Sequence, residues 1–208
     1  MQLHVERADL AALLDIELAA ALPACAGGVT WSSPLARDRF DEPRDARFWT
    51  AISRPDLGAA FADWWPQSGG PSWDAVGRID SGAVVLVEGK AHVAEFGGKG
   101  MGATNPDSIE KIESALDGCR RALHASGSLA DWLGPHYQLA NRLAWTMRLR
   151  ECGQEAVFVY LCFSDDQTNI PTGRDALELA VTSSYGALGI APAAVDGWTT
   201  AVTLPAVG

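Results

Sequence analysis

Apolar residues recur at helical spacing in five stretches of the chain. Leucine, isoleucine and aromatic side chains lie three or four positions apart, with polar residues between them, which is typical of helices that bury one face. Proline or glycine residues mark the ends of several of these stretches. The pattern predicts helices over residues 5–22, 53–65, 105–124, 137–152 and 174–188.

Two neighbouring runs have the composition of β-strands, residues 73–79 and residues 83–92. The loop between them is Asp80-Ser81-Gly82, and a three-residue loop that ends in glycine is typical of a hairpin with a left-handed glycine. The second run begins Ala-Val-Val-Leu-Val, which is apolar on both faces of a strand. We therefore expect it in the middle of a sheet that is covered on both sides.

Two further strands are expected over residues 156–163 and 198–204, whereas residues 30–50 read as an irregular, partly buried connection. Helices thus alternate with strands along most of the chain. This order predicts one α/β domain with a mixed central sheet flanked by helices.

Composition excludes several classes of protein. The 208 residues include 16 Lys and Arg against 26 Asp and Glu, so the net charge is −10, which excludes a protein that coats nucleic acid through bulk basic charge. No apolar run reaches the ~18–20 residues of a membrane span, and the first residues lack the pattern of a signal peptide. The four cysteines form no CxxC pair. We expect a cytoplasmic protein with reduced thiols and no membrane partner.

Charged residues end the apolar strand, where the sequence reads Glu88-Gly89-Lys90. Ionised side chains are costly to bury unless they are paired or bound to a metal. Residues two apart in a strand share a face, so Glu88 and Lys90 project together, and the predicted hairpin register places Asp74 opposite Glu88 on that face. Two opposed carboxylates repel each other, which favours a divalent cation between them; a structural Glu–Lys pair is the alternative.

Asp74 followed by Glu88-Gly89-Lys90 across a hairpin resembles the signature of the PD-(D/E)XK nuclease superfamily, although Trp73 stands where that family often has proline. In the family the hairpin is followed by a helix and another core strand, for which residues 137–152 and 156–163 are the candidates. The resemblance implies a restriction-endonuclease-like fold, with a nuclease-like domain over residues 51–208. Residues 1–50 would then be an N-terminal helical extension packed on this core, the whole forming one compact unit.

The resemblance also implies a role for each residue of the signature. Asp74, Glu88 and the carbonyl of Gly89 would bind Mg²⁺ or Mn²⁺, and Lys90 would orient or deprotonate the attacking water. Hard divalent ions prefer carboxylate oxygens, and such a metal activates the nucleophile and neutralises charge. The implied activity is metal-dependent hydrolysis of phosphodiester bonds in DNA or, with less support, in RNA.

Three further residues are candidates for substrate binding. Gln138 and Arg142 are four apart on one face of a helix and would hold a phosphate, unless they simply cap and solvate that helix. His92 follows Glu88 and Lys90 on the same predicted face and would contact a phosphate, the alternative being a partly exposed histidine. The acidic charge favours a protein partner, a homodimer or a narrow substrate over non-specific DNA digestion. A catalytically inactive nuclease fold that serves binding or assembly is the alternative function, and a small-molecule metal hydrolase is a third.

Overall fold

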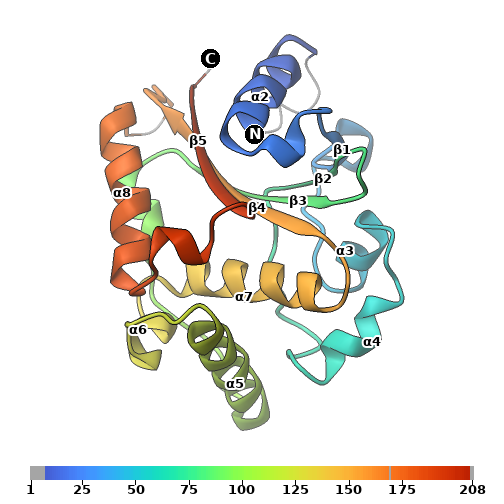
Figure 1. The fold of residues 1–208 in the computed structure, drawn as a ribbon, viewed down its shortest axis with the longest axis vertical. Coiled ribbons are helices and arrows are strands. Elements are labelled where there is room, and N and C mark those ends of the chain that lie inside the picture. The colour runs from blue at the N-terminus through green and yellow to red at the C-terminus, as the bar shows by residue number, and fades with distance from the viewer. Residues whose placement is uncertain (1–7, 169, 207–208) are drawn as a thin grey trace.

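The computed structural model describes residues 8–168 and 170–206 and is built around one five-stranded mixed sheet (Figure 1). The strands lie in the order β1-β2-β3-β4-β5; β1 to β3 are antiparallel, and β4 and β5 run parallel to β3. Their bounds are Thr30–Ser33 (β1), Ala75–Arg78 (β2), Val84–Lys90 (β3), Ala156–Ser164 (β4) and Thr199–Pro205 (β5). The predicted α/β class with a mixed sheet flanked by helices is confirmed.

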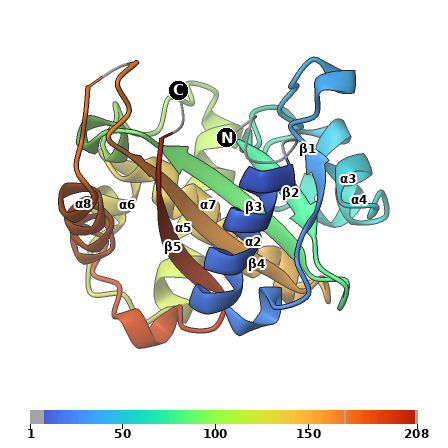
Figure 2. The ribbon, with the colours of Figure 1, turned by 90° about the horizontal axis from the view of Figure 1, so that it is seen from above.

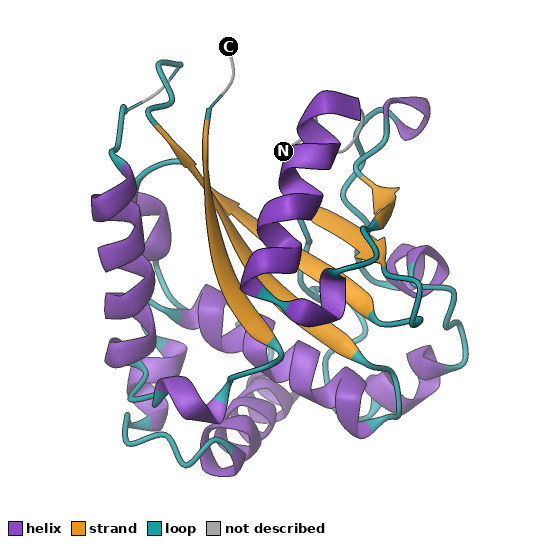
Figure 3. Ribbon diagram, turned by 45° about the horizontal axis from the view of Figure 1, so that its top comes forward, coloured by secondary structure: helices purple, strands orange, loops and turns teal. Residues whose placement is uncertain are grey.

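Helices cover both faces of the sheet. Helix α2 (Ala8–Ala21) crosses one face, as Figures 2 and 3 show from two directions. The long helices α5 (Pro106–Ala122), α7 (Tyr137–Glu151) and α8 (Arg174–Ala187) lie on the other side. The remaining elements are α3 (Ala46–Ala51), α4 (Leu57–Ala62), α6 (Leu129–Leu133) and the 3-10 turns η1 (Pro23–Cys25), η2 (Ala36–Asp38), η3 (Val93–Phe96) and η4 (Pro192–Ala194).

Strand β3 is buried on both faces, as its apolar run predicts. Val84 and Leu86 belong to the hydrophobic cluster beneath α7, whereas Val85 and Val87 belong to the cluster beneath α2. Each alternate side chain is therefore removed from water, which stabilises the strand by about 1.5–3 kcal/mol for every large aliphatic side chain. The charged end of β3 is positioned by this apolar core.

The β2–β3 hairpin has the predicted loop and register. Ala75 pairs with Val87 and Arg78 pairs with Val84, and Gly82 takes the left-handed conformation at φ 88°. Its amide donates to the carbonyl of Ile79 at 2.8 Å, which closes the turn.

Residues 30–50 differ from the expected irregular connection, because they contain β1 and most of α3. Strand β1 is a short, partly exposed edge strand that pairs with β2 alone, with an irregularity between Trp31 and Ser33. Four residues of mixed polarity are too few to show a periodic pattern, so only the pairing with β2 identifies this strand. Within the first fifty residues, α2 and β1 both pack against or extend the central sheet.

None of the helices in the described ranges is long and apolar enough to cross a membrane. All four cysteines lie in these ranges and are unpaired, as predicted.

Candidate functional site

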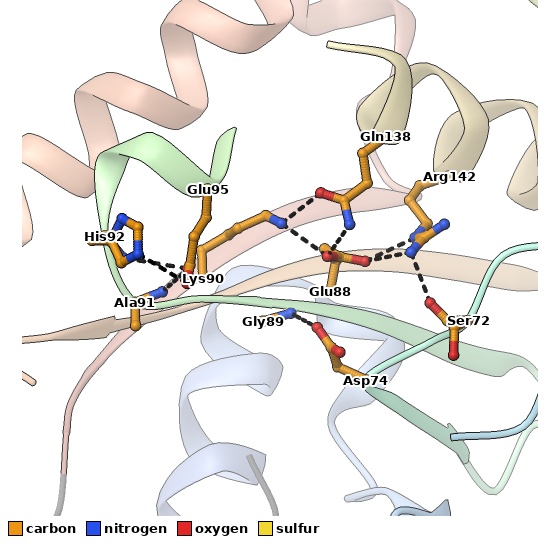
Figure 4. Close-up of polar contacts among 10 residues, drawn as sticks. All are labelled: Ser72, Asp74, Glu88, Gly89, Lys90, Ala91, His92, Glu95, Gln138 and Arg142. Atoms are coloured by element: carbon orange, nitrogen blue, oxygen red, sulfur yellow. Dashed lines mark hydrogen bonds and ion pairs between the residues drawn. The ribbon is translucent and has the colours of Figure 1, made fainter. Parts of the chain in front are cut away.

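The charged end of β3 is buried against α7. The side chains of Glu88 and Lys90 point to the same face of the strand, as predicted, and Lys90 Nζ lies 2.8 Å from Glu88 Oε1 (Figure 4). The two residues are only 3% and 4% exposed. Removing two charges from water is expensive, so the remaining polar atoms of this pair require partners from elsewhere in the fold.

Helix α7 supplies those partners through Gln138 and Arg142, one helical turn apart. The Gln138 amide bridges the pair: Nε2 donates to Glu88 Oε1 at 2.6 Å, and Oε1 accepts from Lys90 Nζ at 2.6 Å. Arg142 donates from Nε to Glu88 Oε2 at 2.8 Å, and its Nη2 lies 2.8 Å from the same oxygen in an ion pair. We call Glu88, Lys90, Gln138 and Arg142 the buried quartet. Its charge-assisted hydrogen bonds join the end of β3 to α7.

The segment before β2 holds Arg142 in place. Arg142 Nη2 donates to the carbonyl of Ser72 at 2.7 Å, and the guanidinium lies over the ring of Trp73, 4.8 Å from its centroid. The cost of burying the Arg142 guanidinium is thus offset by contacts with a carboxylate, a carbonyl and an aromatic ring. Sequence reasoning did not identify Ser72, because its contribution is a backbone carbonyl that carries no residue-type signal.

Asp74 does not share a face with Glu88, and the prediction that the two carboxylates oppose each other is wrong. Figure 4 shows them on opposite sides of β3. Asp74 Oδ2 accepts a hydrogen bond from the amide of Gly89 at 2.6 Å, and a Cβ on Gly89 would lie 3.3 Å from this oxygen. The carboxylate of Asp74 therefore occupies the α2 side of the sheet, where a side chain at position 89 would point.

A local break in the strand alternation explains this placement. Trp73 and Val76 belong to the cluster beneath α7, whereas Ala75 belongs to the cluster beneath α2. The amide of Asp74 donates to the carbonyl of Val87 at 3.1 Å, although Ala75 is the residue paired with Val87. Two consecutive residues thus face one residue of the partner strand, as in a β-bulge, and the side chain of Asp74 is turned to the other side of the sheet.

Asp74 is nevertheless electrostatically close to the buried quartet. Its pKa is raised from 3.8 to about 6, mainly because burial disfavours the carboxylate and secondly because of the negative charge of Glu88. The hydrogen bond from Gly89 opposes this shift but does not cancel it. Among the described residues nothing donates to Asp74 Oδ1. A destabilised carboxylate with a free oxygen is a suitable ligand for a cation.

The donor set at the end of β3 suits a divalent metal only in part. In the described part of the chain, no three His, Cys, Asp or Glu side chains gather into a cluster. Two carboxylates still suit Mg²⁺, which proteins commonly bind through one or two carboxylates together with water and substrate phosphate. Lys90 and Arg142 already neutralise Glu88, however, so the predicted charge conflict is confined to Asp74. Asp74 fits a metal as it stands, whereas Glu88 lies on the other face of β3 with its oxygens occupied, so the two would share one ion only after Asp74 turns to that face.

A polar pocket adjoins the buried quartet. It has a volume of about 340 Å³, and Gln138 and Arg142 form part of its wall together with the glycine-rich loop around Lys99. Asn141, three residues after Gln138, also lines the pocket; it is 5% exposed, and its Oδ1 has no partner among the described residues. The spacing of Asn141 from Gln138 would have identified it as a candidate, since residues three apart on a helix are neighbours.

His92 is not brought to the buried quartet. Its Nε2 lies 3.2 Å from Glu95 Oε1, and Glu95 Oε2 accepts from the amide of Ala91 at 2.7 Å. Strand β3 has ended by this point, so the face shared by Glu88 and Lys90 does not continue to His92 (Figure 4).

Comparison of the chain with family models, with curated proteins and with solved structures finds no match.

Proposed function

We propose that the protein is a metal-dependent phosphodiesterase that cleaves nucleic acid, with DNA favoured over RNA. The observation that carries the proposal is the buried quartet itself: ionised groups concentrated at the end of an apolar strand, next to a polar pocket and to a carboxylate with a raised pKa. Fully buried charges are costly to a fold, and they concentrate where chemistry requires them. The order of hairpin, α7 and β4 also agrees with the order that the PD-(D/E)XK resemblance implies.

The residues divide into metal ligands and phosphate ligands. Asp74, Glu88 and the carbonyl of Gly89 would hold Mg²⁺ or Mn²⁺ once the Asp74 side chain turns from the Gly89 amide to the face of β3 that carries Glu88. When bound, this ion would supply charge neutralisation and an activated water. Lys90 has three N–H donors, of which Glu88 and Gln138 use two, so the third can orient the water or a phosphate oxygen.

Arg142 and Gln138 would position the phosphate. Arg142 Nη1 has no partner among the described residues, although Nε and Nη2 are both engaged. A phosphate in the polar pocket can therefore accept from Nη1 without breaking the contacts that hold the guanidinium.

A cleavage assay tests the proposal. Supercoiled plasmid and single-stranded DNA are incubated with Mg²⁺ or Mn²⁺ and either the wild type or Glu88→Gln, which keeps the size of the side chain and removes its charge. Glu110→Gln is the matched control, because it makes the same change at an exposed position of α5. We expect the wild type and Glu110→Gln to cut equally, and Glu88→Gln to lose activity by about a hundredfold or more.

Equal cutting by all three proteins would show that any cleavage came from a contaminant. No cutting by the wild type on either substrate would remove the proposed activity. Glu88→Gln must also be shown to fold, by circular dichroism and a cooperative unfolding transition, before its loss of cutting is attributed to the site.

The second candidate is a nuclease-like fold that binds or assembles without turnover. The observation that favours it is the complete satisfaction of Glu88, whose two oxygens accept from Arg142, Lys90 and Gln138. A saturated buried network is also what a purely structural core of polar residues requires. Under this alternative, the wild type would bind without cutting, and Mg²⁺ would leave its stability unchanged.

A further inference from the structure

A second pocket, walled by aromatic rings, lies between α3, α4 and α7. We call it the aromatic pocket; its volume is about 270 Å³, and its walls include Trp49, Phe61, Trp65 and Trp145. Trp49 and Trp145 are stacked, with centroids 5.7 Å apart and ring planes at 20°, and the ring of Phe61 lies 4.7 Å from Trp49 and 4.9 Å from Trp145. The carboxylate of Asp45 forms part of the same wall. Phe61, Trp65 and Trp145 belong to the core and are at most 4% exposed, so Trp49, the partly exposed ring of the four, offers a stacking face to a flat, polarisable ligand.

The aromatic pocket is next to the polar pocket. Gly70 lines the polar pocket, its amide donates to Asp45 Oδ1 at 3.1 Å, and a Cβ at this position would lie 3.2 Å from the ring of Trp145. Only the backbone of a glycine thus separates the two pockets at this point. Trp145 also follows Arg142 by three residues on α7, so one helix carries both a phosphate-binding candidate and an aromatic wall.

The polar atoms of the aromatic pocket add a hydrogen-bonding pattern. Trp145 is 4% exposed, yet its indole N–H has no acceptor among the described residues. Buried tryptophan N–H groups usually have a partner, so this donor indicates a missing acceptor. Asp45 offers an acceptor to a ligand N–H. A ligand that stacks on an aromatic ring and donates to a carboxylate has the chemistry of a nucleobase.

The charge of the chain points the same way. With a net charge of −10, the protein cannot gain affinity for nucleic acid by bulk attraction of phosphates. Stacking on aromatic rings does not depend on net charge and works for every base. Bases inside a duplex are hidden by their neighbours, so a pocket of this kind receives an unpaired base.

We propose that the aromatic pocket binds one unpaired nucleobase of a single-stranded nucleic acid, and that the adjoining phosphate lies over Arg142 and Gln138. This inference rests on the proposed function for its choice of substrate, but base binding itself needs neither metal nor cleavage. The pocket would then make single-stranded segments the preferred substrate.

The experiment measures binding in EDTA, by the fluorescence anisotropy of a 5′-labelled strand at low salt. One probe is a single-stranded oligodeoxynucleotide, and the other is a fully abasic strand of the same length. Ala46→Leu tests the pocket, because Ala46 is exposed on α3 and lines its mouth. Ala59→Leu is the matched control, the same change at an exposed position of α4 outside the lining.

We expect the wild type and Ala59→Leu to bind the normal strand about tenfold or more tightly than the abasic strand, and Ala46→Leu to lose that preference. Equal affinity for the two strands, or no binding of either, would overturn the inference. So would competition by tetramethylammonium but not by free nucleoside, which would assign the pocket to a cation. Binding is measured in EDTA, whereas cleavage is measured with Mg²⁺ or Mn²⁺, so the two results are independent. Base-dependent binding in EDTA with no cleavage when the metal is supplied would refute the proposed function and leave this inference standing.

Discussion

Replacing Asp74 by asparagine tests whether the ionised carboxylate destabilises the folded protein. Burial and the charge of Glu88 raise its pKa from 3.8 to about 6, so the folded protein holds this proton more tightly than the unfolded chain does. The stability contributed by this group is therefore fully present below the unfolded pKa of 3.8 and is lost as the pH rises through about 6. Asparagine has no charge to lose, and its amide oxygen can still accept from Gly89.

The magnitude follows from the size of the shift. One pKa unit corresponds to about 1.4 kcal/mol, so the ionised carboxylate lowers the free energy of unfolding by about 3 kcal/mol at pH 8. At pH 5 the carboxyl of Asp74 is mostly protonated in the folded protein, with its pKa of about 6, but mostly ionised in the unfolded chain. The resulting cost to the free energy of unfolding is about 1.5 kcal/mol. Asp74→Asn should thus be more stable than the wild type, and the gain should double between pH 5 and pH 8.

The assay is urea unfolding followed by tryptophan fluorescence at pH 5.0, 6.5 and 8.0 in EDTA. The protein is kept at submicromolar concentration, because its pI near 4.7 leaves it little net charge at pH 5.0 and favours association. Subtracting the two unfolding free energies at each pH removes every titration that the two proteins share. Asp63→Asn, which makes the same substitution at an exposed position, is the matched control. A difference between wild type and Asp74→Asn that stays constant with pH, or an asparagine variant that is less stable at pH 8, would refute the reasoning.

The same variant tests the metal. A ligand that binds only the folded state stabilises it by mass action, and Mg²⁺ or Mn²⁺ at Asp74 would also offset the cost of ionisation. We expect millimolar Mg²⁺ to raise the melting temperature of the wild type at pH 8 and to leave Asp74→Asn unchanged. If both proteins respond equally, the carboxylate is not part of a metal site.

Two further predictions concern stability. Arg142→Met should lower the free energy of unfolding by about 3–5 kcal/mol at pH 7, because it leaves Glu88 Oε2 buried without its charged partner. Adding Glu88→Gln should recover part of that loss, and a double-mutant cycle by urea unfolding that gives no coupling would contradict this. Gly77→Ala should cost about 1–3 kcal/mol because its Cβ would overlap with Val29, whereas Gly118→Ala, with open space in α5, should stabilise by about 0.5–1 kcal/mol; equal thermal shifts for the two variants would contradict the packing.

Local spacing alone was sufficient for most of the fold. The hairpin loop at residues 80–82 has a turn chemistry that few conformations satisfy, so its register could be derived before the structure. The double-sided apolar run placed β3 in the interior, and the helical spacing located α2, α5, α7 and α8 within a few residues. The pairing of Glu88 with Lys90 followed from the two-residue period of a strand.

Tertiary structure decided how the site is completed. Sequence placed Gln138 and Arg142 on one face of a helix, but only the packing of α7 on β3 turns that face to Glu88. The side of Asp74 depends on the break in alternation just before β2, where Trp73 and Ala75 are buried in different clusters although they are two residues apart. The aromatic pocket unites side chains that are far apart in the chain. The spacing of residues in one segment shows which side chains share a face of a helix or strand. Which two faces come into contact depends on how separate segments pack together, and no single segment contains that information.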